Sequence, residues 1–266
     1  CGEECMNAHW PKHKEYHKVQ KQHAEQIREG TEPDRDRSIA EAAARRAEAT
    51  GDEYDKRFAA AVAHMAEGDF NAAAKAWRKI IKEWPGAPGA YRNLAVSLQH
   101  AGRLVEAAPL SLKAMELYKD GTEHWAHSAA TAFNLLKTYD CDEVPKPDWW
   151  NDEGLKALSA RVVVLVPNQQ EACAMRAYVL SGDVIPKDQW KVGPRTAAEI
   201  KEAAFWYRRA AMATNTPQEK FNFEELLRAC DEFADPLLAE EEAEAAKARA
   251  AATAEAAEAL KVAEAK

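Results

Sequence analysis

The middle of the chain carries apolar residues at the spacing of amphipathic helices, and the pattern occurs twice, at residues 54–87 and 88–121. In the second copy, one helical face carries Tyr91, Leu94, Ala95 and Leu98, and a later face carries Ala107, Leu110, Ala114 and Leu117. Recurrence at i, i+3, i+4 and i+7 predicts a helix. Gly102 separates the two runs, and glycine ends helices because it adopts the left-handed conformation at low cost. Each copy is therefore predicted to form a helical hairpin.

The two copies also match at their small residues. With Gly68 aligned on Gly102, the matched pairs are Ala61 with Ala95, Ala73 with Ala107, and Ile80 with Ala114. A fixed period of this length is typical of repeat proteins. A single hairpin of this size cannot bury both of its apolar faces, so each hairpin is expected to stack on a neighbour.

These residues resemble the tetratricopeptide repeat (TPR) family. That family favours a large residue early in the first helix, a Leu-Gly or Leu-Ala pair, a glycine at the turn, small residues in the second helix and often a closing proline. Here the large residue is Arg57 in the first unit and Tyr91 in the second, and the pair is Ala60-Ala61 and Leu94-Ala95. The turn glycines are Gly68 and Gly102, and the second helices carry Ala73 and Ile80 in the first unit and Ala107 and Ala114 in the second. Pro85 closes the first unit, and Lys119 stands at that place in the second. The resemblance implies an all-α, TPR-like solenoid of helical hairpins with about four units.

Two further units continue the pattern with interruptions. The third begins near Thr122 and the fourth at Asn168. An insertion near 139–150 ends at the adjacent Trp149 and Trp150, and a second insertion near 184–195 contains Trp190. The helices that follow these insertions are expected at about 154–164 and 202–211. The solenoid is predicted to span residues 54–230.

The segments beside the solenoid have a different character. Residues 32–53 are predicted to be a linker followed by a helix that Ser38 caps. Thr216-Pro217 opens a closing helix, and Asp235-Pro236 is expected to begin a tail. Residues 231–266 are mostly alanine and glutamate, which have high helix propensity, so a long C-terminal helix is predicted there. Such a helix has little to bury, and it is either solvated or held by a partner.

The N-terminal segment, residues 1–31, carries a candidate metal site followed by a polar helix. Cys1, Cys5, His13 and His17 have the spacing C-x3-C-x7-H-x3-H, and thiolate and imidazole are the ligands that zinc prefers. With Trp10, these residues resemble the second half of a MYND-type zinc finger. The resemblance implies zinc as the cofactor, with further ligands upstream of Cys1, and the chain is accordingly expected to be a fragment whose natural N-terminus lies upstream.

Two departures from the MYND pattern affect the predicted function of this segment. His17 stands where the family usually has cysteine, and Met6 stands where it has glutamine. In MYND fingers that glutamine and the tryptophan contact short proline-rich peptides. Trp10 is therefore a candidate partner-binding residue, and packing of Trp10 against the next helix is the open alternative.

Composition and charge exclude several classes of function. The chain has 266 residues and a net charge of −8, which argues against nucleic-acid binding. No apolar run approaches the roughly 20 residues of a membrane-spanning helix, so no membrane insertion is expected. The five cysteines are spread along the chain, which suits metal binding in a reducing compartment better than a disulfide framework. An intracellular location, the cytoplasm or the nucleus, is predicted, with an organelle as the alternative.

No pattern of catalytic residues is present in the sequence. The chain lacks a glycine-rich phosphate loop and an H-E-x-x-H motif, and Cys173 and Cys230 lie in helical patterns as core residues. The protein is therefore predicted not to be an enzyme. A fragment of a SET/MYND-type lysine methyltransferase is the enzyme alternative, although SET-domain motifs do not occur in these residues.

The resemblance to TPR proteins implies a concave groove lined by the first helix of each hairpin. The groove positions are Phe58, Val62, Met65, Arg92, Val96, Gln99, Ala126, Ala130, Phe133, Asn134, Arg176 and Val179, and Trp149 and Trp150 are further candidate contacts. This surface lacks the basic set with which some TPR domains hold a terminal carboxylate. The predicted function is a protein-interaction scaffold or adaptor that binds a peptide or protein partner. A subunit built permanently into a large multiprotein complex is the alternative.

Overall fold

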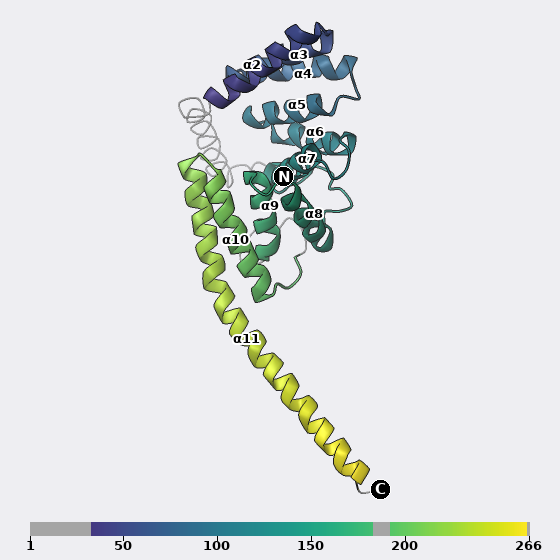
Figure 1. Cartoon of the computed structure of the whole chain (residues 1–266), viewed down its shortest axis with the longest axis vertical. Coiled ribbons are helices and arrows are strands. Elements are labelled where there is room, and N and C mark those ends of the chain that lie inside the picture. Colours follow the sequence, from purple (N-terminus) through teal and green to yellow (C-terminus); the bar gives the residue numbers. More distant parts are fainter. Residues whose placement is uncertain (1–32, 183–191, 265–266) are drawn as a thin grey trace, which may run out of the picture. The chain divides into compact units, whose positions relative to one another are not determined.

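The computed structural model describes residues 33–182 and 192–264, and within them the chain forms α-helices and one short 3-10 helix, with no strand (Figure 1). The prediction of an all-α fold is confirmed. The chain divides into two compact units, unit 1 up to Pro145 and unit 2 from Lys146. Unit 1 contains α2 (Pro33–Thr50), α3 (Glu53–Ala66), α4 (Phe70–Glu83), α5 (Pro88–His100), α6 (Leu104–Leu117), α7 (Glu123–Leu136) and η1 (Tyr139–Cys141). Unit 2 contains α8 (Asp152–Leu165), α9 (Gln170–Ser181), α10 (Ala197–Ala213) and α11 (Pro217–Glu264).

In unit 1, α3 with α4 and α5 with α6 form the two predicted hairpins, and each helix packs mainly on the next along the chain. Gly68 and Gly102 both have φ +74°, the left-handed conformation expected from the sequence. Beside them, the Asp69 N–H donates to the His64 carbonyl at 2.9 Å, and the Arg103 N–H donates to the Leu98 carbonyl at 2.8 Å. The same capping bond therefore closes the first helix of both repeats.

Small residues let the helices of unit 1 approach closely. Ala61 and Ala95 in the first helices, and Ala73 and Ala107 in the second helices, are completely buried. Trp77 of α4 is the largest fully buried side chain of this core. The repeat positions that match between the two hairpins are therefore the positions that form the interior of unit 1.

One polar side chain in this core offers a test of the packing. Replacing Ser111 of α6 with alanine is expected to raise the free energy of unfolding by about 1 kcal/mol, because a buried polar atom without a partner costs stability. The Ser111 hydroxyl is buried, and no hydrogen-bond partner for it lies within the described residues. Ser97→Ala is the matched control, since Ser97 is equally buried but donates to the Asn93 carbonyl at 2.8 Å. Urea denaturation that shows equal losses for both variants would contradict the expectation.

Two helix boundaries differ from the sequence-based expectation. Helix α2 begins at Pro33 and not at Ser38, because proline fits the first turn of a helix without losing a hydrogen bond. Helix α11 runs without a break from Pro217 to Glu264, through Pro236, where a separate tail was expected to begin. A proline inside a helix costs about 3 kcal/mol. The packing of Ala234 and Leu237 on both sides of it against the core of unit 2 offsets that cost.

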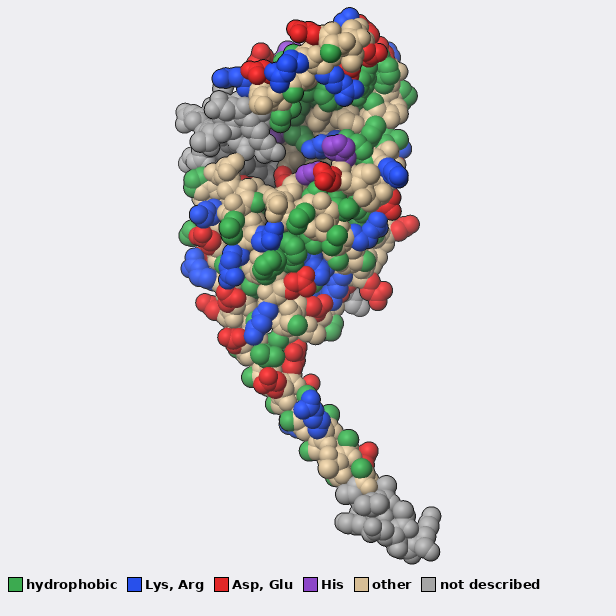
Figure 2. All heavy atoms as spheres, in the orientation of Figure 1, with side chains coloured by type: hydrophobic (Ala, Val, Ile, Leu, Met, Phe, Trp, Pro, Cys, Tyr) green, Lys and Arg blue, Asp and Glu red, His purple; other side chains and the backbone are tan. Residues whose placement is uncertain are grey.

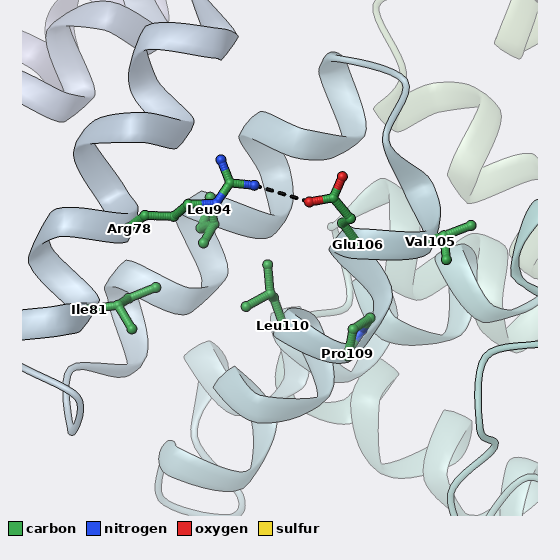
Figure 3. Close-up of a pocket in the computed structure, with 7 residues that line it drawn as sticks. All are labelled: Arg78, Ile81, Leu94, Val105, Glu106, Pro109 and Leu110. Carbon is green, nitrogen blue, oxygen red and sulfur yellow. Dashed lines mark hydrogen bonds and ion pairs between the residues drawn. The ribbon is translucent and has the colours of Figure 1, made fainter.

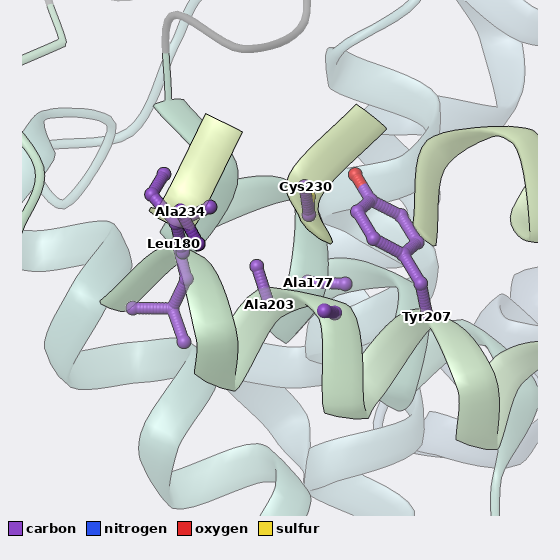
Figure 4. Packing of buried hydrophobic residues seen from close by; sticks show 8 residues of the cluster. Ala177, Leu180, Ala203, Tyr207, Cys230 and Ala234 are labelled. Atoms are coloured by element: carbon purple, nitrogen blue, oxygen red, sulfur yellow. The ribbon is translucent and has the colours of Figure 1, made fainter. Parts of the chain in front are cut away.

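The core of unit 2 forms where α9, α10 and α11 meet. Figure 4 shows Leu180 of α9, Tyr207 of α10, and Cys230 and Ala234 of α11 directed into one buried cluster. The Tyr207 hydroxyl lies 3.3 Å from the Ser181 hydroxyl, so this buried phenol has a hydrogen-bond partner. The first five turns of α11 therefore belong to the folded core of unit 2.

Arg195 joins three segments of unit 2. Its two terminal guanidinium nitrogens lie 3.0 and 2.5 Å from the two carboxylate oxygens of Asp152, in the first turn of α8. It also donates to the carbonyl of Val179 in α9, at 3.2 and 2.8 Å, and to that of Gly193 at 2.9 Å. Desolvation alone would raise the pKa of the Asp152 carboxyl, but the hydrogen bond and charge of Arg195 outweigh it and the pKa is lowered. Arg195 is therefore a buried cation with a full set of acceptors.

The distal part of α11 has no packing partner among the described residues of unit 2. Every residue from 242 to 256 is exposed, and Figure 2 shows this stretch standing clear of the helices that surround the core of unit 2. The last described anchor is Glu241, whose carboxylate accepts a hydrogen bond from the Ala197 N–H at the start of α10, at 2.8 Å.

Candidate protein-binding surface

The predicted groove positions of unit 1 separate into accessible and buried residues. Six of them, on α3, α5 and α7, are partly or fully accessible to solvent. We call this set the helix-A surface, and its members are Phe58, Met65, Arg92, Val96, Gln99 and Asn134. Val62 is only 7% exposed and Phe133 is fully buried, as are Ala126 and Ala130. A partner cannot reach these buried side chains without displacing the helices, so they support the surface from beneath.

Phe58 lies at the junction of three helices. Its ring meets the Trp77 ring edge to face, with 4.9 Å between centroids. A methyl group added at Gly89 would lie 3.7 Å from the Phe58 ring and 3.6 Å from the Tyr118 hydroxyl, so both aromatic residues lie against the start of α5. Because its inner side is fixed by Trp77, Phe58 presents a rigid apolar contact to the helix-A surface.

Arg92 lies close to a tyrosine at the edge of the helix-A surface. Burial raises the pKa of the Tyr118 hydroxyl, and the neighbouring Arg92 guanidinium lowers that pKa in part. Arginine remains charged and has several donors that a ligand can use. The arrangement offers a positive charge close to Phe58, a combination that suits a peptide with an acidic and an apolar residue.

Tyr54, Trp84 and Tyr118 were not among the predicted contacts, although they continue this surface along one edge of unit 1. The Trp84 ring meets Tyr54 edge to face at 5.4 Å, and the Arg57 guanidinium lies 5.5 Å from the centroid of the Trp84 ring. Trp84 and Tyr118 occupy the same position of the two repeats, the last residue before the closing turn. That recurrence of an aromatic residue is the signal in the sequence that could have identified them.

The predicted contacts of unit 2 have internal partners. Arg176 of α9 donates to Glu202 of α10 at 2.9 Å, and to the Lys156 carbonyl and the Ser159 hydroxyl of α8 at 3.1 and 3.3 Å. Its side chain is only 13% exposed. Arg176 therefore connects three helices and is not an open ligand contact. Val179, on the same helix, is completely buried.

The two adjacent tryptophans lie in the loop before α8. Trp150 is 9% exposed and Trp149 is half-buried, with 5.8 Å between their ring centroids. The Lys146 ammonium lies 5.3 Å from the centroid of the Trp150 ring. Of the two predicted contacts, Trp150 is thus buried and only Trp149 retains an accessible face.

The predicted zinc ligands Cys1, Cys5, His13 and His17, and the predicted contact Trp10, lie outside the described residues. Within the described ranges, no group of histidine, cysteine and acidic side chains could hold a metal ion. Cys141, Cys173 and Cys230 are buried thiols, and Cys173 and Cys230 were expected to be core residues. Burial raises the pKa of the Cys230 thiol to about 12, so it is not a reactive nucleophile at neutral pH.

Comparison with known proteins does not identify a family. No protein-family model matches the chain, and no curated protein matches it in sequence. Two crystal structures of the protein MamA are similar to this chain. The first has 13% sequence identity, covers 68% of this chain and 92% of the MamA chain, and has a TM-score of 0.42. The second has 16% sequence identity, covers 73% of this chain and 98% of the MamA chain, and has a TM-score of 0.38. Identities and TM-scores this low support no statement about function. As for membranes, none of the helices in the described part of the chain combines the length and the apolar character needed to cross one.

Proposed function

We propose that this protein is a non-catalytic interaction scaffold that binds a peptide segment of a protein partner on the helix-A surface of unit 1. The observation that carries the proposal is the juxtaposition of Phe58, which is rigidly supported, with the charged Arg92 and the accessible Val96 and Gln99. A stack of helical hairpins presents such a surface without needing to change shape, which limits the entropy lost on binding. The zinc finger that residues 1–17 resemble would provide a second interaction module in the same scaffold.

A permanent subunit of a large assembly is the second candidate, and a feature of unit 2 favours it. Phe205 and Met212 of α10, and Phe221 and Phe233 of α11, are between 45% and 80% exposed. Large apolar side chains exposed in numbers on one unit are typical of surfaces that another protein covers. In that case the surface of unit 2 and the distal part of α11 would be buried by neighbouring subunits.

Affinity purification distinguishes the two proposed functions. The natural full-length protein is purified at low and at high salt, and the partners that are recovered with it are identified and counted. The variant Val96→Glu with Gln99→Glu changes the helix-A surface, and Met212→Glu with Phe221→Glu changes unit 2 at exposed positions. We expect a partner that high salt weakens and that is lost only in the helix-A variant. A fixed set of subunits that resists salt and is lost only in the unit 2 variant would instead establish the assembly subunit. Recovery of no partner would refute both.

A further inference from the structure

A groove lies on the opposite set of helices of unit 1, between the second helices of the two hairpins. Its volume is about 530 Å³, and it is lined by Arg78 and Ile81 of α4, Leu94 of α5, and Val105, Glu106, Pro109 and Leu110 of α6. Figure 3 shows Arg78 and Ile81 on one wall, Val105, Glu106 and Pro109 on the other, and Leu94 and Leu110 between them. None of these positions belongs to the helix-A surface.

The charge around this groove is opposite in sign to that of the whole protein. Residues 70–117, which form the three helices of the groove, contain seven lysines and arginines and three glutamates, a net charge of +4 in a chain of net charge −8. Lys75, Arg78 and Lys82 are exposed and lie at i, i+3 and i+7 of α4, on one face of that helix. Within the described residues, neither Lys75 nor Lys82 has a carboxylate at ion-pairing distance. This face therefore has positive charge available for an external acidic group.

The ion pair between Arg78 and Glu106, which crosses the groove, is weak. Arg78 lies 3.1 Å from Glu106, and both side chains are more than 40% exposed. Exposed pairs of this kind contribute about 0–1 kcal/mol, so a ligand carboxylate can replace Glu106 at little cost. Glu106 would keep a partner after such an exchange, because Arg103 also donates to both of its oxygens at 2.7 Å.

The floor and the far wall of the groove are apolar. Val105 is 52% exposed at the first turn of α6, and Ile81 and Leu110 are partly exposed beside it. Pro109 lies inside α6 and has no amide N–H, so the Val105 carbonyl lacks its usual donor in the helix. The groove thus combines apolar contacts with a basic rim.

We propose that the groove between α4 and α6 binds an acidic segment of a partner protein. Large apolar side chains of that segment would contact Ile81, Val105 and Leu110, and its carboxylates would pair with Lys75, Arg78 and Lys82. The positive charge of the groove favours an acidic segment. The apolar floor favours a protein over a nucleic acid, because the phosphates of a nucleic acid make no favourable contact with apolar side chains. The proposal rests on the scaffold function but uses a different face, so the scaffold would hold two ligands at once.

Fluorescence anisotropy of the full chain with labelled probes tests this proposal. The main probe is a synthetic peptide of about four helical turns that carries leucine on one face and glutamate on the other. One comparison peptide has alanine for leucine, a second has lysine for glutamate, and the third probe is single-stranded oligothymidine. We expect the leucine–glutamate peptide to bind at least about tenfold more tightly than the other three, and raised salt to weaken it.

Two variants of the groove and one matched control localise the binding. Lys75→Glu with Lys82→Glu is expected to weaken binding by about tenfold, and Val105→Glu by a similar factor because it adds a repelling charge to the wall. Glutamate is favourable in the first turn of a helix, so Val105→Glu should fold normally. Arg208→Glu with Lys220→Glu makes the same charge change at exposed positions of unit 2 and should bind as wild type does.

Four results would overturn the proposal. The first is equal weakening by the groove and control variants, the second is binding of oligothymidine as tight as that of the leucine–glutamate peptide, and the third is no binding of that peptide at all. The fourth concerns the helix-A variant. The helix-A variant Val96→Glu with Gln99→Glu should keep full affinity for the peptide. A partner lost in that variant while the peptide still binds would support both surfaces, and a loss of peptide affinity in it would place the ligand on the helix-A surface and refute the groove.

Discussion

Replacing Arg195 with alanine is expected to lower the free energy of unfolding of unit 2 by roughly 3–5 kcal/mol, the usual loss when one partner of a buried ion pair is removed. The Arg195 side chain is only 4% exposed, and it donates to the Asp152 carboxylate and to the carbonyls of Val179 and Gly193. Its removal takes the Arg195 hydrogen bonds from all three acceptors, and it leaves the Asp152 carboxylate with the weaker ion pair to Lys156, at 3.8 Å. It also empties space beside Gly182, where an added methyl group would lie only 2.7 Å from the Arg195 side chain.

Urea denaturation followed by circular dichroism measures this loss, and hydrogen exchange of residues 170–181 assigns it to α9 of unit 2. Arg57→Ala is the matched control, because Arg57 pairs with Glu53 and Glu83 at the surface and its loss should cost at most about 1 kcal/mol. Adding Asp152→Asn to Arg195→Ala should restore part of the stability, since it removes a largely buried charge that would otherwise keep only the weaker ion pair to Lys156. Equal losses for Arg57→Ala and Arg195→Ala would show that the ion pair does not hold unit 2 together.

The sequence predicted the hairpins of unit 1 well because their determinants are local. A glycine that adopts the left-handed conformation and a row of small residues act within one repeat, and the repeat occurs twice. The capping bonds beside Gly68 and Gly102 are accordingly the same in both copies. The helices of the second copy were placed from their apolar spacing, and those of the first copy from their match to the second.

The positions of long-range contacts could not be predicted in this way. Asp152 and Arg195 are 43 residues apart, and nothing periodic relates them. Arg176 occupies a groove position by register, yet Glu202 lies close enough in the fold to bind it. For the same reason Val62 and Phe133 looked accessible in the repeat pattern but are buried. Burial depends on which neighbouring helix covers a position, and the register of a repeat does not contain that information.

The groove between α4 and α6 was missed for a related reason. Resemblance to TPR proteins directs attention to the first helix of each hairpin, whereas the groove lies between second helices. Its signal is in the charges, because α4 carries Lys75, Arg78, Lys79 and Lys82 with Glu83 as its only acidic residue. In an acidic chain, such a concentration of positive charge on one helix indicates a surface with its own binding preference.

Trp77 connects the two proposed surfaces, and its loss is the second large effect that we expect. Replacing Trp77 with alanine should lower the free energy of unfolding of unit 1 by about 3–5 kcal/mol, because a fully buried aromatic side chain leaves a large cavity. Trp77 supports Phe58 of the helix-A surface on one side. On the other side of the same helix stand Lys75 and Arg78 of the groove. In a stack of hairpins, loosening α4 also weakens its contacts with α3 and α5.

Circular dichroism during urea denaturation measures the effect without relying on tryptophan fluorescence, which the substitution itself changes. Trp84→Ala is the control, because Trp84 is half-exposed at the end of the same helix and should cost only about 1–2 kcal/mol. Trp77→Phe should fall between the two, since it keeps an aromatic contact with Phe58 and removes a buried ring N–H that has no partner within the described residues. If Trp77→Ala were no more destabilising than Trp84→Ala, the rigidity ascribed to Phe58 would have no basis. Both binding surfaces would then have to be explained without a fixed α4.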